Sequence, residues 1–236
     1  MAKTPMIVLP CRRMWTGVAV ALGFLLFGGA IAQAQQFSAD LVMVRHDGDA
    51  PTPAGWISAS GNMVRLETPE LADGFFLIDG ATPSAYFVRP EARIFMQARQ
   101  SSRLTRVFVP VDPADPCRQW QAMAKLAGIA EQGDWHCERA GEETIGTQNT
   151  IRYRAVSGSG QEFSGWIDPA RKFPLRIKTE DGAIVTAENI RDEAQPAQLF
   201  EMPVGLRRFD PRALIEQIKQ SDVWVDRPTD QPRTKP

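Results

Sequence analysis

The sequence is poor in the side chains that most catalytic sites require. Its 236 residues include only two histidines and three cysteines, so few pairs of a nucleophile with a histidine base can form. The motifs G-x-S-x-G and H-E-x-x-H and the glycine-rich phosphate loop do not occur. Glu142 and Glu143 are adjacent, and neighbours on a strand face opposite sides. The sequence therefore predicts no catalytic residue, no metal and no cofactor, and it favours a protein that is not an enzyme.

The sequence also lacks an excess of charge of one sign. It has 27 Lys and Arg residues against 28 Asp and Glu residues, a formal net charge of −1. Proteins that bind nucleic acid neutralise phosphates with a basic patch. Nucleic acid is therefore not an expected partner.

A long apolar run occurs only near the start of the chain. Three basic residues precede the run at residues 14–30, and the small-x-small triplet Ala-Gln-Ala ends at Ala34. This order predicts a secretory signal peptide over residues 1–34, cleaved after Ala34. An uncleaved membrane anchor is the alternative, because the run nearly reaches the ~20 residues of a span. A lipid anchor is disfavoured, because Cys11 precedes the apolar run.

The remaining chain has the length of one all-β or α+β domain. It contains no internal repeat and no linker, so residues 35–226 are predicted to form a single domain. Residues 227–236 are polar and rich in proline. They are predicted to be a disordered tail.

Two cysteines remain beyond the predicted signal peptide, Cys117 and Cys137. In an oxidising compartment the default is a disulfide, which would stabilise the fold by about 3 kcal/mol in the chain-entropy model. Metal binding is the alternative, because His136 adjoins Cys137. That alternative is weaker, since a structural zinc site uses four ligands. His46 lies in a turn-like stretch and is expected to be solvated.

Short apolar runs with alternating polar residues follow one another along the chain and predict strands. They occupy residues 37–45, 55–60, 62–67, 74–78, 85–88, 94–97, 106–111, 151–156, 162–168, 174–179 and 184–190. Residues 115–130 have helical periodicity, with Asp115 as N-cap and Pro116 in the first turn. A second helix is predicted at residues 211–221. The expected fold class is α+β, with a large twisted antiparallel sheet that curls around a hollow.

The predicted strands present one apolar face and one charged face. Leu175 and Ile177 share one face of their strand, whereas Arg176 and Lys178 share the other. The apolar face could be a core that the helices cover completely. Two helices are few for so many strands, so an apolar ligand could occupy part of the space. The residues expected to line this cavity are Leu41, Met43, Phe75, Leu77, Ile151, Tyr153, Phe163, Ile167, Leu175 and Ile177.

The second half of the chain carries a series of motifs that resembles the LolA-like periplasmic proteins. The pattern combines a Trp-x-Asp strand end, Pro-Leu-(Arg/Lys)-Ile, an Asn-Ile strand end and Leu-Phe-x-x-Pro-x-Gly. It occupies Trp166, Asp168, Pro174, Leu175, Ile177, Asn189, Ile190, Leu199, Phe200, Pro203 and Gly205. The stretches FSADLVMV, GNMVRLE and YFVRPEARIFM are similar to the first meander of uncharacterised relatives. The resemblance covers most of residues 37–206.

This resemblance implies an unclosed β-barrel with helices over an apolar hollow, in a periplasmic protein. In LolA-type carriers the hollow holds the acyl chains of outer-membrane lipoproteins. RseB-type regulators use a similar fold to bind a membrane protein. The present chain departs from the carriers because a strand, not a helix, begins at Phe37.

Two functions follow from the resemblance. The first is an acyl-chain carrier for lipid or lipoprotein, with affinity that rises with chain length and depends little on head-group charge. The second is an envelope regulatory or assembly module that acts through protein contacts with an inner- or outer-membrane partner.

Overall fold

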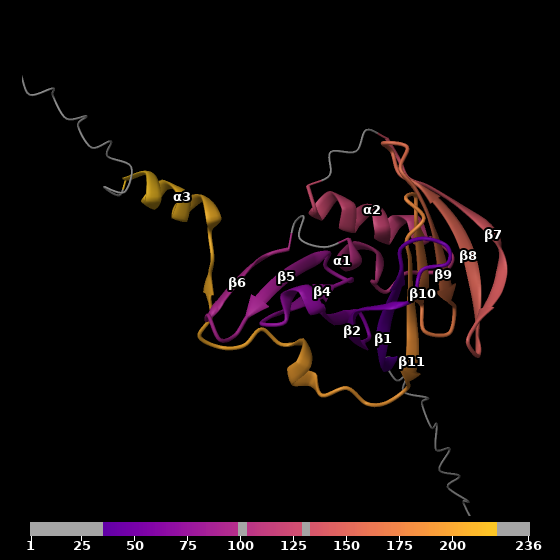
Figure 1. Cartoon of the computed structure of the whole chain (residues 1–236), viewed down its shortest axis with the longest axis horizontal. Coiled ribbons are helices and arrows are strands. Elements are labelled where there is room, and N and C mark those ends of the chain that lie inside the picture. The colour runs from indigo at the N-terminus through magenta and orange to yellow at the C-terminus, as the bar shows by residue number, and fades with distance from the viewer. Residues whose placement is uncertain (1–34, 99–102, 129–132, 221–236) are drawn as a thin grey trace, which may run out of the picture. The chain divides into compact units, whose positions relative to one another are not determined.

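One sheet dominates the structure. The computed structural model describes residues 35–98, 103–128 and 133–220, and within them twelve strands form one sheet (Figure 1). Their order is β12-β6-β5-β4-β3-β2-β1-β11-β10-β9-β8-β7. The two end strands do not pair with each other, so the sheet is not closed. The expected α+β class with an unclosed barrel is confirmed. The predicted signal peptide at 1–34 and the predicted tail at 227–236 lie outside the described residues.

The first six strands form an antiparallel meander. The β2–β3 hairpin turns at Gly61, whose φ of 58° lies in the left-handed region that glycine adopts without a steric cost. The strands are β1 (Gln36–Val44), β2 (Thr52–Ser60), β3 (Met63–Glu67), β4 (Phe75–Asp79), β5 (Ser84–Arg89) and β6 (Ile94–Gln97).

The next five strands form a second antiparallel meander, and its last strand joins the first meander because β11 pairs with β1. In that pairing Leu41 lies opposite Ala187. The two-residue strand β12 (Arg207–Arg208) pairs parallel with β6. The strands of the second meander are β7 (His136–Ile145), β8 (Gln148–Val156), β9 (Glu162–Asp168), β10 (Phe173–Thr179) and β11 (Ile184–Arg191).

The helices are short. They are α1 (Leu104–Val107), α2 (Pro116–Leu126) and α3 (Pro211–Gln220), with 3₁₀ turns at Pro69–Leu71 and Ala197–Phe200. The predicted cap of α2 is confirmed, because the Asp115 carboxylate accepts a hydrogen bond from the Arg118 backbone N–H at 3.4 Å. Across the described parts of the chain, each helix is too short or too polar to span a bilayer.

Two strand predictions differ from the structure. Residues 106–111 are not a strand: α1 ends at Val107, and the following residues bury Phe108 and Val109 without joining the sheet. The Val111 N–H donates instead to the Lys172 carbonyl at 2.8 Å. Strand β7, in contrast, is present but was not predicted. It is an exposed edge strand that pairs only with β8, so it has no apolar face to give an alternating pattern.

The main hydrophobic core lies on one face of the sheet, called here the inner face. Side chains from β1 to β5 and β8 to β11 pack there against α2 and residues 108–111. Phe37, Ile57 and Leu175 are at most 1 % exposed. The faces predicted for the first strand and for 174–179 are confirmed, because Leu41 and Ile177 belong to this core.

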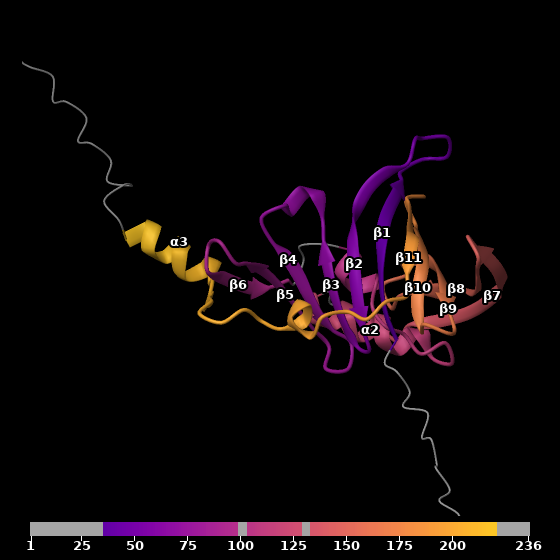
Figure 2. The same cartoon turned by 90° about the horizontal axis from the view of Figure 1, so that it is seen from below.

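The opposite, outer face has a smaller cluster on β4 to β6. Phe75, Leu77 and Val88 are buried there, and Met202 and Leu206 from the C-terminal segment pack on them. Figure 2 shows this segment crossing from β11 to β6. The segment therefore covers the apolar cluster on the outer face of β4 to β6.

The two residues of the Trp-x-Asp motif, Trp166 and Asp168, form side-chain hydrogen bonds at the C-terminal end of β9. The Trp166 indole N–H donates to Glu143 at 2.7 Å, and the Arg176 guanidinium donates to the same carboxylate at 3.0 Å. Glu143 is thus bound by two side chains, although it remains exposed to solvent.

The Asp168 carboxylate closes the next turn by accepting the backbone N–H groups of Ala170 and Arg171. Asp168 also forms an ion pair with Arg171, whose side chain is only 10 % exposed. Burial lowers the pKa of Arg171, but hydrogen bonds to Asp192 and Asp168 outweigh burial and raise it overall. Arg171 therefore stays charged and holds the turn together.

Candidate ligand pocket

A pocket of about 510 Å³ lies between the helices and the inner face of β9 to β11. This volume is within the range of ligand sites in proteins. Half of its lining residues are apolar: Leu104, Val107, Trp120, Ala124, Trp135, Phe163, Ile177 and Val185. The others are polar or charged: Arg103, Arg106, Ser157, Gln161, Glu162, Thr179, Glu180 and Asp181.

Trp120 of α2 forms part of the apolar wall on the helical side. Its indole N–H donates to the Val107 carbonyl at 3.1 Å, which fixes the ring against the end of α1. Its ring meets Phe163 edge to face with centroids 4.9 Å apart. The ring packs over Gly165, where an added Cβ would lie 2.7 Å from Trp120 Cη2. Glycine in β9 is therefore what allows Trp120 to lie close against the sheet.

The sheet supplies the opposite wall. Ile177 of β10 and Val185 of β11 are direct partners across the antiparallel pair, and both line the pocket. Phe163 contacts two tryptophans, because the Trp135 ring centroid also lies 5.8 Å from its own. These contacts fix an aromatic wall whose side chains have little freedom to fill the pocket themselves.

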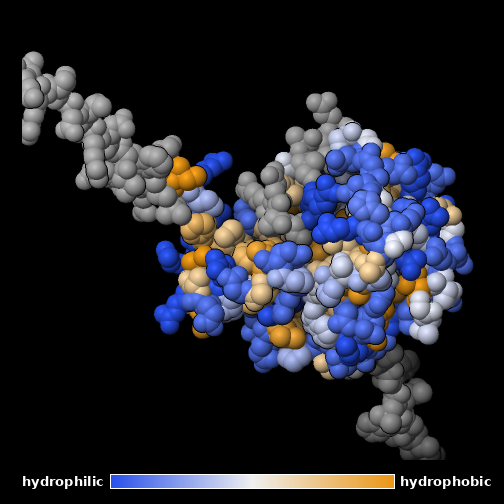
Figure 3. All heavy atoms as spheres, in the orientation of Figure 1, coloured by the Kyte–Doolittle hydropathy of each residue, from blue (hydrophilic) through white to orange (hydrophobic). Residues whose placement is uncertain are grey.

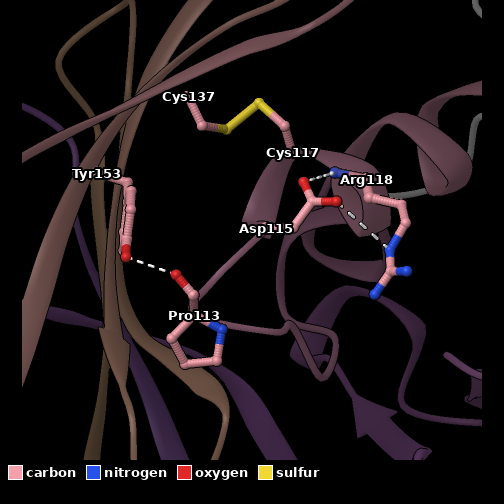
Figure 4. The surroundings of a disulfide bond; sticks show 6 residues. All are labelled: Pro113, Asp115, Cys117, Arg118, Cys137 and Tyr153. Atoms are coloured by element: carbon pink, nitrogen blue, oxygen red, sulfur yellow. Dashed lines mark hydrogen bonds and ion pairs between the residues drawn. A yellow bond between two sulfur atoms is a disulfide. The ribbon is translucent and has the colours of Figure 1, made fainter.

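The disulfide Cys117–Cys137 is present, with a Cα–Cα distance of 5.6 Å, and confirms the predicted pairing. It joins the first turn of α2 to the edge strand β7 (Figure 4). Beside it, the Tyr153 hydroxyl donates to the Pro113 carbonyl at 2.6 Å. Together these two links attach the segment that begins α2 to β7 and β8.

The structure gives no support to the metal alternative at this place. Both cysteines are oxidised in the disulfide, so neither offers a thiolate to a metal. Within the described ranges, no three His, Cys, Asp or Glu side chains come together as a metal site.

The ten residues predicted to line the cavity fall into three groups. Phe163 and Ile177 line the pocket. Six others belong to the main core or pack against it: Leu41, Met43, Ile151, Tyr153, Ile167 and Leu175. Phe75 and Leu77 lie in the cluster on the outer face, so their predicted side of β4 is corrected. All four residues from Phe75 to Ile78 are apolar, so alternation could not distinguish the two faces.

Several pocket residues were not expected from the sequence. Leu104 and Trp135 come from segments without a periodic apolar pattern, and Val107 comes from the run that was predicted as a strand but ends α1, which is only four residues long. The helical spacing of α2 placed Trp120 on the buried side, but not in a pocket. Its contact with Gly165, which lies far along the chain, carries no local sequence signal.

The outer surface near β7 and β8 contrasts with the pocket. Figure 3 shows mostly hydrophilic residues on the part of the viewed face that these strands occupy. Of the ten residues of β7, Glu138, Arg139, Glu142 and Glu143 are charged and exposed. A bulge between Arg139 and Gly141 interrupts the strand register. Charges and a bulge on an edge strand oppose pairing with another chain.

Comparison with known proteins gives only structural matches. No protein-family model matches the chain, and no curated protein matches it in sequence. Among solved structures, an uncharacterised conserved protein from Thermus thermophilus aligns with a TM-score of 0.42 and 13 % identity. That alignment covers 75 % of this chain and 90 % of the other.

Two further structures illustrate the range of the matches. PNGF-II aligns with a TM-score of 0.46 and 8 % identity, covering 79 % of this chain and 34 % of that one. A LolA superfamily protein from Nitrosomonas europaea aligns with a TM-score of 0.32 and 12 % identity, covering 72 % of this chain and 90 % of that one. A LolA superfamily protein is among the solved structures to which this chain is similar.

Proposed function

We propose that this chain is a periplasmic binding protein whose pocket takes an acyl chain of a lipid or lipoprotein, without catalysis. The observation that carries the proposal is the apolar wall formed by Trp120, Phe163 and Ile177 beneath a charged rim. Ligand pockets in proteins are concave and mostly apolar, with a few polar groups that fix orientation. An acyl chain on a polar head matches that division.

The energetics favour a ligand with a long apolar part. Each methylene that leaves water contributes about 0.8 kcal/mol before the costs of ordering are subtracted. Affinity should therefore rise with acyl-chain length until the pocket is full.

Two sequence features support the location and the class of ligand. Residues 1–34 have the order of a secretory signal peptide, which would deliver residues 35–226 to the periplasm as one domain. The motif series around Trp166 and Asp168 resembles the LolA-like proteins, whose carriers hold acyl chains.

A displacement titration tests the proposal. A fluorescent fatty acid is bound to the purified protein and displaced by saturated fatty acids of increasing length. Saturable binding that tightens with length supports the proposal. No saturable binding at any length contradicts it and leaves the protein-contact function as the better explanation.

A pair of variants locates the binding site. Ala124 is buried and lines the pocket, so Ala124→Phe should fill the space and weaken binding of the longest chains most. Lys125 is the exposed next residue of α2 and does not line the pocket, so Lys125→Phe is the matched control. Thermal unfolding of both variants separates loss of binding from loss of the fold.

A further inference from the structure

The charges at the pocket rim are divided between its two sides. Arg103 and Arg106 come from the start and body of α1. Glu180 and Asp181 come from the turn between β10 and β11, and Glu162 begins β9. The helical side is therefore cationic, and the sheet side is anionic.

One ion pair crosses this divide. Arg103 Nη1 lies 3.6 Å from Asp181 Oδ2, and the two side chains are 70 % and 63 % exposed. The Thr179 hydroxyl donates to the other Asp181 oxygen. This hydrogen bond is the main reason that the pKa of Asp181 is lowered, and Arg103 adds to the effect. An ion pair this exposed is weak, so a ligand's charged groups can replace it without a large loss.

The other two carboxylates differ in their surroundings. Glu162 accepts two hydrogen bonds from Arg154, each at 2.6 Å, so its charge is already balanced. The Glu180 carboxylate lines the pocket and, among the described residues, makes no ion pair or hydrogen bond. The rim thus offers the Arg103 guanidinium, held by one exposed ion pair, on the helical side and the unpaired Glu180 carboxylate on the sheet side.

We infer that the pocket prefers an amphiphile with a zwitterionic head that carries a phosphate and an ammonium group. This inference rests on the proposed function. The phosphate would lie towards Arg103, because guanidinium and phosphate form strong paired hydrogen bonds. The ammonium would lie towards Glu180 and Asp181.

Heads with one charge fit this rim less well. A carboxylate or a phosphoglycerol head would form an ion pair with Arg103 but would be repelled by the carboxylates of Glu180 and Asp181. A quaternary ammonium head would pair with Glu180 and Asp181 but would be repelled by the Arg103 guanidinium. We therefore expect a preference for a single-chain phosphoethanolamine lipid, in place of the small head-group dependence expected from the sequence.

Four ligands with hydrocarbon chains of the same length test the preference in the displacement titration. They are a lysophosphoethanolamine, a lysophosphoglycerol, a fatty acid and an alkyltrimethylammonium salt. A zwitterionic head makes one more exposed ion pair with the rim than a singly charged head does, so it should bind up to roughly fivefold more tightly than the others. Raising the salt concentration should shrink that advantage.

A charge reversal assigns the preference to the rim. Glu180→Lys should shift the preference to the anionic lysophosphoglycerol. Glu188 is an exposed carboxylate of β11 that does not line the pocket, so Glu188→Lys should leave the order of ligands unchanged.

The outcomes separate the two proposals. Equal affinity for all four heads, with binding that still depends on chain length, refutes the head-group inference and retains the acyl-chain function. The head-group inference is also refuted if Glu188→Lys changes the order as much as Glu180→Lys does. Absence of saturable binding for every ligand refutes the acyl-chain function itself.

Discussion

Trp120 packs directly over Gly165, although the two residues lie on different elements, α2 and β9. A Cβ atom at position 165 would lie 2.7 Å from Trp120 Cη2 and 3.3 Å from Ile177 Cδ1. The first distance is shorter than real carbon contacts allow. The indole cannot simply move away, because its N–H is hydrogen-bonded to the Val107 carbonyl.

We therefore expect Gly165→Ala to destabilise the fold by about 1–3 kcal/mol, the usual cost of overpacking a core. It should also weaken acyl-chain binding, because the displaced indole would enter the pocket. Urea unfolding followed by tryptophan fluorescence measures the first effect. Ser164→Ala changes the neighbouring position, whose side chain faces the other side of β9, and should have little effect. Equal stability of the two variants would show that the indole has room to move.

Ile177 and Lys178 test which face of β10 is inner. Ile177 is 1 % exposed and lines the pocket, so Ile177→Asp would bury an unpaired carboxylate. We expect loss of soluble protein or of binding. Lys178 is exposed on the outer face, so Lys178→Asp should be mild. Arg176 shares that face but is a poorer control, because it binds Glu143 and lies over the Trp166 ring. Similar yields for Ile177→Asp and Lys178→Asp would contradict the register.

The disulfide should stabilise the fold and keep α2 in position. Replacing both Cys117 and Cys137 by serine should lower the free energy of unfolding by about 3 kcal/mol in the chain-entropy model. The affinity for long acyl chains should fall as well, since α2 carries the pocket residues Trp120 and Ala124. Urea unfolding with and without reductant provides the measurement. The serine variant should be insensitive to reductant, and a wild type that is equally insensitive would refute the prediction.

The ion pair between Arg154 and Glu162 should make stability depend on pH. The hydrogen bond from Arg154 lowers the pKa of Glu162 below its ordinary value of 4.5. A lowered carboxylate pKa means that the pair stabilises the fold fully above pH 4.5. This contribution is lost as the pH falls through the lower folded-state pKa. Both side chains are exposed, so the effect should be small and screened by salt.

Glu162→Gln is the variant that isolates this pair. Its stability should fall below that of the wild type at neutral pH and converge with it in acid. Urea midpoints measured across this range at low salt give the comparison. A difference that grows as the pH falls would have the wrong sign and would exclude the ion pair as its cause.

Features set by local patterns could be predicted from the sequence. Alternation of apolar and charged side chains identified β10 and its buried face, because one side of each strand must leave water. Asp115 and Pro116 marked the start of α2, since each satisfies a specific need of the first helical turn. The Cys117–Cys137 pair followed from the number of cysteines in a chain whose first residues predict export.

Only the tertiary structure decided the features that depend on distant partners. Four consecutive apolar residues in β4 gave no alternation, so the pairing of neighbouring strands determined that Phe76 faces the core and Phe75 faces outward. Residues 108–111 have the composition of a strand, but they fill the core instead of joining the sheet. The pocket itself arises where Trp120, Trp135 and Val185 meet from three separate parts of the chain. Such a meeting depends on long-range packing, which no local pattern of residues encodes.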